Sequence, residues 1–308
     1  MMQRFFQLET VIRRAPLGLR FLDLVRGVTV NDGLVVMAWA LGTRAGARPA
    51  PTALRSPLSG VYGFRSLPGL RRFEMAERPA SDWCGSPPQG SPPEPTAVEL
   101  TDLDTLRGLY LATEESPPRA NFIISVEDRM ERFLPQTLLM CLPKERLIEV
   151  PLLSSPARLA PAGLGVVRGE VIRQQDAQPA AWALVTVSPD NGVTDYVAIT
   201  DARGMFTLFV PYANPLPSLQ GSPPHGSGTL DQLTWPLTIR VFYQPSRQRF
   251  VPGLDPPDML SILEQAVAEI YDQIGVHSST LMRPLRFGVD VVITTVYQSQ
   301  LLLDPAPP

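Results

Sequence analysis

The clearest hydrophobic pattern in the chain is a two-residue alternation that follows a turn. Phe206 and Leu208 occupy alternate positions after Gly204, which is typical of a strand with one buried face. Asp201 can accept hydrogen bonds from the backbone just after it, and Gly204 adopts a positive φ at little steric cost. Pro211 cannot donate to a β-ladder. The pattern therefore predicts Asp201 and Gly204 in a turn, Phe206 and Leu208 in the core, and a strand end at Pro211.

A weaker copy of this pattern lies upstream. Gly60 precedes Tyr62 and Phe64, and Pro68 follows them, so turn glycine, aromatic strand and proline stop come in the same order. Two copies are too few for a solenoid, and they suit a pair of β-sandwiches. We therefore expect Gly60 and Pro68 to lie in turns and Tyr62 and Phe64 to lie in a strand of the first sandwich.

Proline abundance supports a mainly β fold of two tandem β-sandwich domains with Pro-rich linkers and one C-terminal helix. The chain has 34 prolines in 308 residues, roughly twice the average share, and proline disfavours long helices. The expected segments are an N-terminal strand or arm at 1–18, a first sandwich at 19–135 with a Pro/Gly/Ser-rich insertion at 79–118, a linker at 136–164, a second sandwich at 165–250 and a helix-and-strand extension at 251–308. Residues 3–14 alternate well enough for a strand, which could join the first sheet or be lent to a neighbour by strand addition.

Shorter patterns predict the other elements. Leucines recur every three residues over 100–109, which is consistent with a short helix. An Asp-Asn-Gly turn at 190–192 indicates a hairpin. Apolar runs predict strands at 21–25, 34–39, 122–126, 165–172, 182–187, 196–200, 237–243 and 285–293.

A C-terminal helix is expected between Asp258 as its N-cap and Gly275 just past its end. One stripe of this helix would carry apolar side chains that cover the chain's own sandwich or, alternatively, bind a partner: Leu260, Leu263, Val267, Ile270 and Ile274.

Candidate catalytic chemistry is sparse in the sequence. The two histidines, His225 and His277, lack metal-ligand spacing, and no nucleophile elbow, P-loop or dinucleotide-binding motif is present. We expect no enzyme activity, no catalytic or metal site and no cofactor. A net charge of −3 gives no indication of a nucleic-acid partner. Trp83, in a flexible tract, remains a possible anchor for a protein partner or a glycan.

The two cysteines, Cys84 and Cys141, do not suggest a disulfide framework, and Cys141 lies in an apolar run where a small buried hydrophobe is expected. No apolar stretch has the length of a signal peptide or a membrane span. These observations predict synthesis and assembly in a reducing cytoplasm without membrane insertion, with release as part of an extracellular particle as a further option.

Parts of the second half resemble the carboxypeptidase regulatory-like family, a transthyretin-like β-sandwich. The resemblance is carried by 168–171, 179–181, 185–187 and the Thr-Asp-x-x-Gly-x-Phe-x-Leu run at 200–208. It implies a non-catalytic accessory module.

A broader resemblance covers most of the chain. The matching segments are 32–34, 59–64, 67–70, 126–128, 132–135 and 179–183, with the Phe-Leu-Pro string at 133–135 and Pro-Tyr at 211–212. They are similar to carboxypeptidase-regulatory-like proteins of phage-tail-like contractile injection system gene clusters, while 79–118 has no counterpart. This resemblance implies a structural subunit, associated with the baseplate, whose partners are baseplate, tube or sheath components and symmetric copies of itself. The alternative function is a glycan- or cell-envelope-binding module, because such sandwiches often present loops to ligands.

Overall fold

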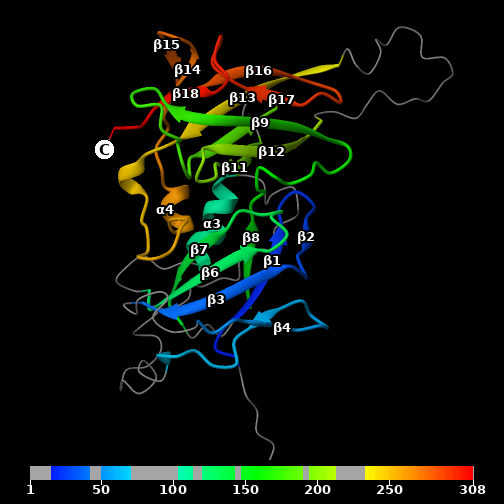
Figure 1. The fold of residues 1–308 in the computed structure, drawn as a ribbon. Helices are drawn as coiled ribbons and strands as arrows, with labels where there is room; N and C mark the ends of the chain where they lie inside the picture. Colours follow the sequence, from blue (N-terminus) through cyan, green and yellow to red (C-terminus); the bar gives the residue numbers. More distant parts are fainter. Residues whose placement is uncertain are drawn as a thin grey trace, which may run out of the picture.

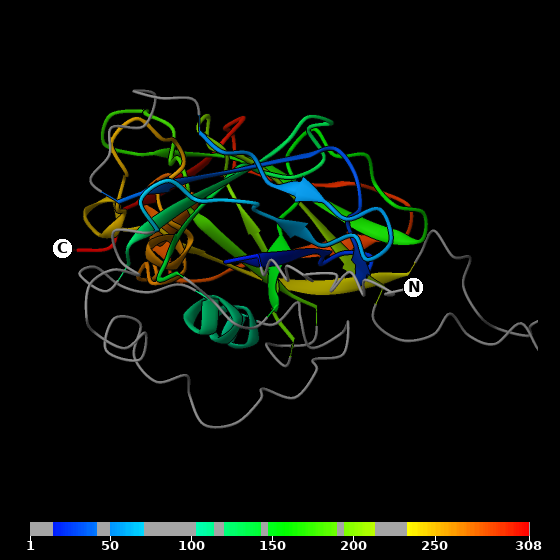
Figure 2. The same cartoon turned by 90° about the horizontal axis from the view of Figure 1, so that it is seen from below.

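The computed structural model describes residues 15–41, 50–70, 103–113, 120–142, 147–189, 194–212 and 233–307, and this part of the chain is mainly β (Figures 1 and 2). The strands of the first half are β1 (Gly18–Asp23), β2 (Val28–Thr29), β3 (Leu34–Ala40), β4 (Leu54–Arg55), β5 (Tyr62–Gly63), β6 (Phe122–Asp128), β7 (Gln136–Met140) and β8 (Leu147–Leu152). Those of the second half are β9 (Leu164–Arg173), β10 (Leu184–Ser188), β11 (Tyr196–Ile199), β12 (Met205–Pro211), β13 (Thr234–Phe242), β14 (Glu269–Gln273), β15 (Val276–Ser278), β16 (Leu281–Arg286), β17 (Val291–Ile293) and β18 (Leu301–Asp304). The helices are α3 (Leu103–Thr113), α4 (Met259–Leu263) and a short 3₁₀ turn (Pro245–Arg247).

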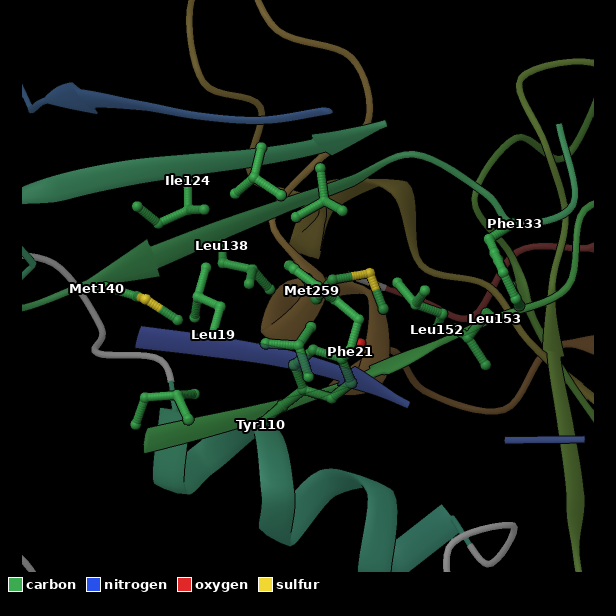
Figure 3. Close-up of a cluster of buried hydrophobic side chains, with 14 of the residues drawn as sticks. Leu19, Phe21, Tyr110, Ile124, Phe133, Leu138, Met140, Leu152, Leu153 and Met259 are labelled. Atoms are coloured by element: carbon green, nitrogen blue, oxygen red, sulfur yellow. The ribbon is translucent and has the colours of Figure 1, made fainter. Parts of the chain in front are cut away.

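The first sandwich unit occupies the lower half of Figure 1. One sheet has the order β2-β1-β5-β4, and β8 also belongs to it, paired in parallel with β1. The second sheet has the order β3-β6-β7. Side chains of both sheets meet between them, together with Tyr110 of α3 (Figure 3). Phe21 and Tyr62 pack edge to face with ring centroids 5.3 Å apart, so the alternating apolar positions of β1 and β5 do form a core.

The second sandwich unit occupies the upper half of Figure 1. Its sheets have the orders β11-β10-β13-β16 and β12-β9-β18-β14-β15, and β17 also pairs with β9. Apolar residues at alternate positions of β9, β10, β12 and β13 fill the space between them. Gly169 sits where a Cβ would lie 2.6 Å from the ring of Phe206, so glycine is required there to let the ring enter the core.

The two units share most of their strand pairing. In the first, β1 pairs with β5 and β3 pairs with β6, while in the second β9 pairs with β12 and β10 pairs with β13, all antiparallel. The correspondence continues beyond the repeat that the sequence indicated. β7 extends β6 as β16 extends β13, and β8 lies parallel to β1 as β17 and β18 lie parallel to β9.

The prediction of a linker at 136–164 was wrong for the first half of this segment. Residues 136–140 and 147–152 form β7 and β8, which are mostly buried. Prolines in this stretch indicated a loop, yet Pro151 lies in β8, which among the described strands pairs with β1 alone. An edge strand tolerates a proline because one of its sides needs no donor. The chain joins the two units through residues 153–163, which follow β8.

The expected helix from Asp258 to Gly275 was also wrong in extent. Asp258 does act as the N-cap, accepting a bond from the backbone N–H of Ser261, but α4 ends at Leu263. The following residues form β14 and β15, and Gly275, with φ of +84°, lies in the turn between them. Pairing of β14 with β18 overrides the helical periodicity of the sequence. The segment 251–308 is therefore an integral part of the fold.

Several other predictions can be compared directly. A helix does form near the leucine repeat, as α3, and the strand expected at 285–293 is divided into β16 and β17 by a turn at Gly288, with φ of +71°. The N-terminal segment 1–14 and the hairpin turn at 190–192 lie outside the described residues.

Candidate functional site

The junction between the two sandwich units holds a small, mainly apolar cavity of about 220 Å³. The first unit contributes the turn at 24–27, the connecting segment contributes Ser154, and the second unit contributes β11, β12 and the start of β9. Known small-molecule pockets are usually larger, about 300–1,000 Å³. The cavity is therefore better matched to a few side chains of a polypeptide than to a cofactor.

A buried ion pair fixes this junction. The guanidinium of Arg158, in the connecting segment, lies 2.6 Å from the carboxylate of Asp23 at the end of β1, and both side chains are about 6% exposed. The other oxygen of Asp23 accepts bonds from the backbone N–H groups of Val25 and Arg26, and Arg158 also donates to Ser154 Oγ at 3.0 Å. Both members of the pair therefore have further hydrogen-bond partners, which buried charges need.

Aromatic rings from both units enclose the same guanidinium. Arg158 lies 4.9 Å from the ring centroid of Phe133 in the first unit and 5.7 Å from that of Phe209 in the second. Thr207 Oγ1 donates to the carbonyl of Pro156 at 3.2 Å. Arg158 therefore connects β1, the connecting segment and β12, and it holds the two units as one body.

A second, more polar hollow of about 560 Å³ lies beside the first and is bounded in part by Asp23, Asp32, Arg132 and Arg158. Arg132 binds both oxygens of Asp128, at 3.0 and 3.1 Å, and reaches Asp32 at 3.0 Å. The hydrogen bond to Asp128 raises the pKa of Arg132. Burial raises the pKa of Tyr62. Asp32, Asp128 and Arg132 are paired with one another, so these charges stabilise the turns that carry them.

Buried polar side chains connect α4 to the second unit. Gln265 donates to the carbonyl of Trp182 at 2.8 Å and accepts from the backbone N–H of Gln244 at 2.9 Å. Arg249 donates to both oxygens of Asp258 at 3.0 Å. In Figure 1, α3 and α4 lie between the two units, and Arg107 of α3 donates to a carbonyl of α4 at 2.9 Å.

A hydrogen bond from a tyrosine hydroxyl to a carboxylate joins two of the C-terminal strands. Tyr271 of β14 donates to Asp304 of β18 at 2.5 Å, and this bond, with burial, raises the pKa of Tyr271 to about 12. His277, expected after a helix, is instead in β15, where it lies 3.2 Å from Glu269 and packs edge to face on Tyr271.

The predicted turn residues occupy turns in both units. Gly60 and Gly204 have φ of +66° and +78°. Asp201 Oδ1 accepts from the backbone N–H groups of Arg203 and Met205, both at 2.9 Å. Tyr62 lies in β5, Phe206 and Leu208 lie in β12, and all three are buried. Phe64 is also buried, but it lies just after β5 and not in the strand as predicted. Pro68 is exposed in a turn.

The residues expected to bind a partner do not form one stripe. Leu260 and Leu263 of α4 and Ile270 of β14 are buried in the protein's own core. Val267 and Ile274 remain 40% and 66% exposed. Trp83 lies outside the described residues.

Further exposed apolar residues, which the sequence did not indicate, lie in the β14–β15 hairpin that carries Ile274 and in the loop before β18. Val276, Val296 and Tyr297 are also exposed, Tyr297 at 97% and with φ of +66°. The two loops that carry them are joined by a 2.8 Å bond from the N–H of Val296 to the carbonyl of Asp272. We call Ile274, Val276, Val296 and Tyr297 the C-terminal apolar patch.

Cys141 contradicts the expectation of reduced thiols, because it is buried and disulfide-bonded. The sequence has one other cysteine, Cys84, which lies outside the described residues. Structural disulfides are typical of oxidising environments.

The Asp23–Arg158 pair was also not predicted from the sequence. The partners are 135 positions apart, and neither belongs to a local motif. The preceding Ser-Ser-Pro string gave a loop signal only. Nothing in a single sequence specifies such a long-range ion pair.

Within the described ranges, no group of three or more His, Cys, Asp or Glu side chains is arranged to hold a metal ion. None of the helices there is long and apolar enough to cross a bilayer.

No protein-family model and no curated protein matches this sequence. Two solved structures share weak similarity with it. A streptococcal ancillary pilin is 9% identical with a TM-score of 0.21, over 97% of this chain and 65% of the pilin. The chain thus spans just under two thirds of the pilin's length. A candidate adhesin from Bacteroides ovatus is 9% identical with a TM-score of 0.24, over 98% of this chain and the whole of that one.

Proposed function

We propose that this chain is a non-enzymatic structural subunit that holds neighbouring proteins together in a large assembly. The observation that carries this proposal is a fixed two-unit body with an apolar surface at one end. The Asp23–Arg158 pair and the shared core beneath α4 hold the units together, and the C-terminal apolar patch remains exposed. A rigid body loses little conformational entropy when it binds, which favours a component that must position its neighbours.

The assembly we propose is a phage-tail-like contractile injection system, with this chain at the baseplate. This placement rests on the sequence resemblance described above. The disulfide at Cys141 adds a condition, because a bond of this kind persists outside a reducing cytoplasm. We therefore propose that the chain functions in the released particle, where the surroundings are oxidising.

Particle assembly tests the proposal. In cells that encode the system, deleting the gene should abolish complete particles, and the wild-type chain should restore them. A double variant of the patch, Ile274→Asp with Tyr297→Asp, should fold but fail to restore them, because charge disfavours burial at a protein interface. The matched control is Val292→Asp, at a residue of β17 that is 61% exposed. Normal particles in the absence of the gene would refute the proposal.

A further inference from the structure

The strands β11 and β12 face each other across the junction cavity, and each is an edge strand. Among the strands of the described residues, β11 pairs with β10 alone and β12 pairs with β9 alone. They are consecutive in the chain and belong to opposite sheets of the second unit. The cavity therefore lies at the open side of this sandwich, bounded by the turn at 24–27 of the first unit.

The pairing register shows which backbone groups of β12 are unused. The N–H of Val171 donates to the carbonyl of Gly204 at 2.8 Å, so Gly204 directs its backbone toward β9. In an antiparallel ladder this direction alternates along the strand. The backbone N–H and C=O groups of Thr207 and Phe209 therefore point away from β9, and no strand of the described chain pairs with them. Both residues are nearly fully buried, at 1% and 5% exposure.

The same reasoning applies to β11. The N–H of Thr200 donates to the carbonyl of Ala183 at 2.9 Å, which directs the backbone of Val197 away from β10. Val197, Thr207 and Phe209 all border the cavity. Buried backbone groups in native proteins almost always have partners. An extended polypeptide beside β12 would supply those partners and place its own apolar side chains in the cavity.

We propose that this groove receives residues 3–14 of a second copy of the chain by strand addition. This segment precedes the described residues. Phe6, Leu8 and Ile12 share one alternating face with Thr10, whereas Gln7, Glu9 and Arg13 lie on the other face together with Phe5 and Val11. The first face has the apolar side chains that the buried face of a strand carries. The inference rests on the proposed structural function and names one of its partners.

Chain length favours a second copy over the same molecule. β1 runs from Gly18 to Asp23, and the turn that borders the cavity follows its far end. A segment that doubles back from Ala15 must span nine residues, about 30 Å, before it reaches the groove. Fewer than half of residues 3–14 would then remain to pair. The arm of a neighbouring copy has no such limit and can use the whole alternating run.

Sedimentation velocity of the full-length protein over a hundredfold concentration range tests this inference. We expect reversible self-association that a synthetic peptide of residues 3–14 inhibits, whereas a scrambled peptide of the same composition does not. Val197→Arg should weaken association by about tenfold or more. The matched control Val292→Arg, on the exposed face of β17, should leave it unchanged. Circular dichroism establishes that both variants are folded.

Each other outcome overturns the inference. If the protein remains monomeric throughout, its groove is empty, filled with water or occupied by its own arm. If it self-associates but the peptide does not inhibit this, the copies associate through another surface. If Val197→Arg does not fold, the peptide competition with wild-type protein still decides. A chain that enters particles without self-association would overturn this inference and leave the proposed function standing. A chain that self-associates as expected but is not needed for particles would support this inference and overturn the proposed function.

Discussion

Replacing Arg158 by methionine removes the charged group that joins the two sandwich units while keeping most of the side-chain volume. Asp23 would then be a buried carboxylate without its cation, although two backbone N–H groups still bind it. Removing one partner of a buried ion pair typically costs 3–5 kcal/mol. Contacts of Arg158 with the rings of Phe133 and Phe209 add about 0.5–1 kcal/mol each. Because the backbone bonds remain, we expect a loss of about 3–4 kcal/mol in the free energy of unfolding.

Urea unfolding followed by tryptophan fluorescence measures this loss. Asp23→Asn should cost about 2–3 kcal/mol, and the double variant should cost less than the sum by more than about 1 kcal/mol, since partners in one ion pair are coupled. Arg20→Met is the matched control. Its pair with Glu149 is 3.1 Å long but about a third exposed, so it should cost less than about 1 kcal/mol. Equal losses for Arg158→Met and Arg20→Met, or additive losses at Asp23 and Arg158, would refute the proposed role of the junction.

Three further predictions concern the turns, the C-terminal strands and the disulfide. Gly204→Ala should lower the free energy of unfolding in urea by more than about 2 kcal/mol, because φ is +78° and the new Cβ would lie 2.4 Å from a backbone oxygen. The matched control is Gly163→Ala, where φ is +82° but the space is open, and it should lower this free energy by only about 1 kcal/mol. Folding raises the pKa of Tyr271 from 10.0 to about 12, so its bond to Asp304 is fully stabilising below pH 10 and is lost as pH rises through 12. Tyr271→Phe should therefore lower the melting temperature at neutral pH and reduce its fall between pH 10 and 12; an unchanged alkaline profile would contradict this. A reducing agent should lower the free energy of unfolding by about 2–4 kcal/mol, and Cys141→Ser should abolish that effect; wild-type insensitivity to reductant would count against a structural disulfide.

The sequence predicted the local features that depend on near neighbours. Asp201 and Gly204 are separated by three positions, and their turn needs only a short polar side chain and a residue that tolerates positive φ. The strands around them show period-two alternation because one face is buried. The mainly β class and the similarity of the two halves follow from these local signals.

Features that depend on distant partners could not be predicted in the same way. The stretch 259–274 has a helical stripe, yet β14 forms because Ile270 pairs with Leu303 of β18. β7 and β8 were mistaken for a linker because prolines interrupt their pattern. At the junction, Asp23 and Arg158 meet only after both units fold. The edge of β12 is unpaired within the described ranges because of how the strands are ordered in the sheet, which a local pattern does not reveal.

The stoichiometry of purified particles tests the central claim most directly. Quantitative mass spectrometry of intact contractile particles should find this chain in a fixed ratio to the sheath, tube and baseplate proteins across preparations. The chain should also remain in the particle after high-salt washing. A chain that is absent from intact particles, or present in variable trace amounts that washing removes, would contradict the structural role proposed for it.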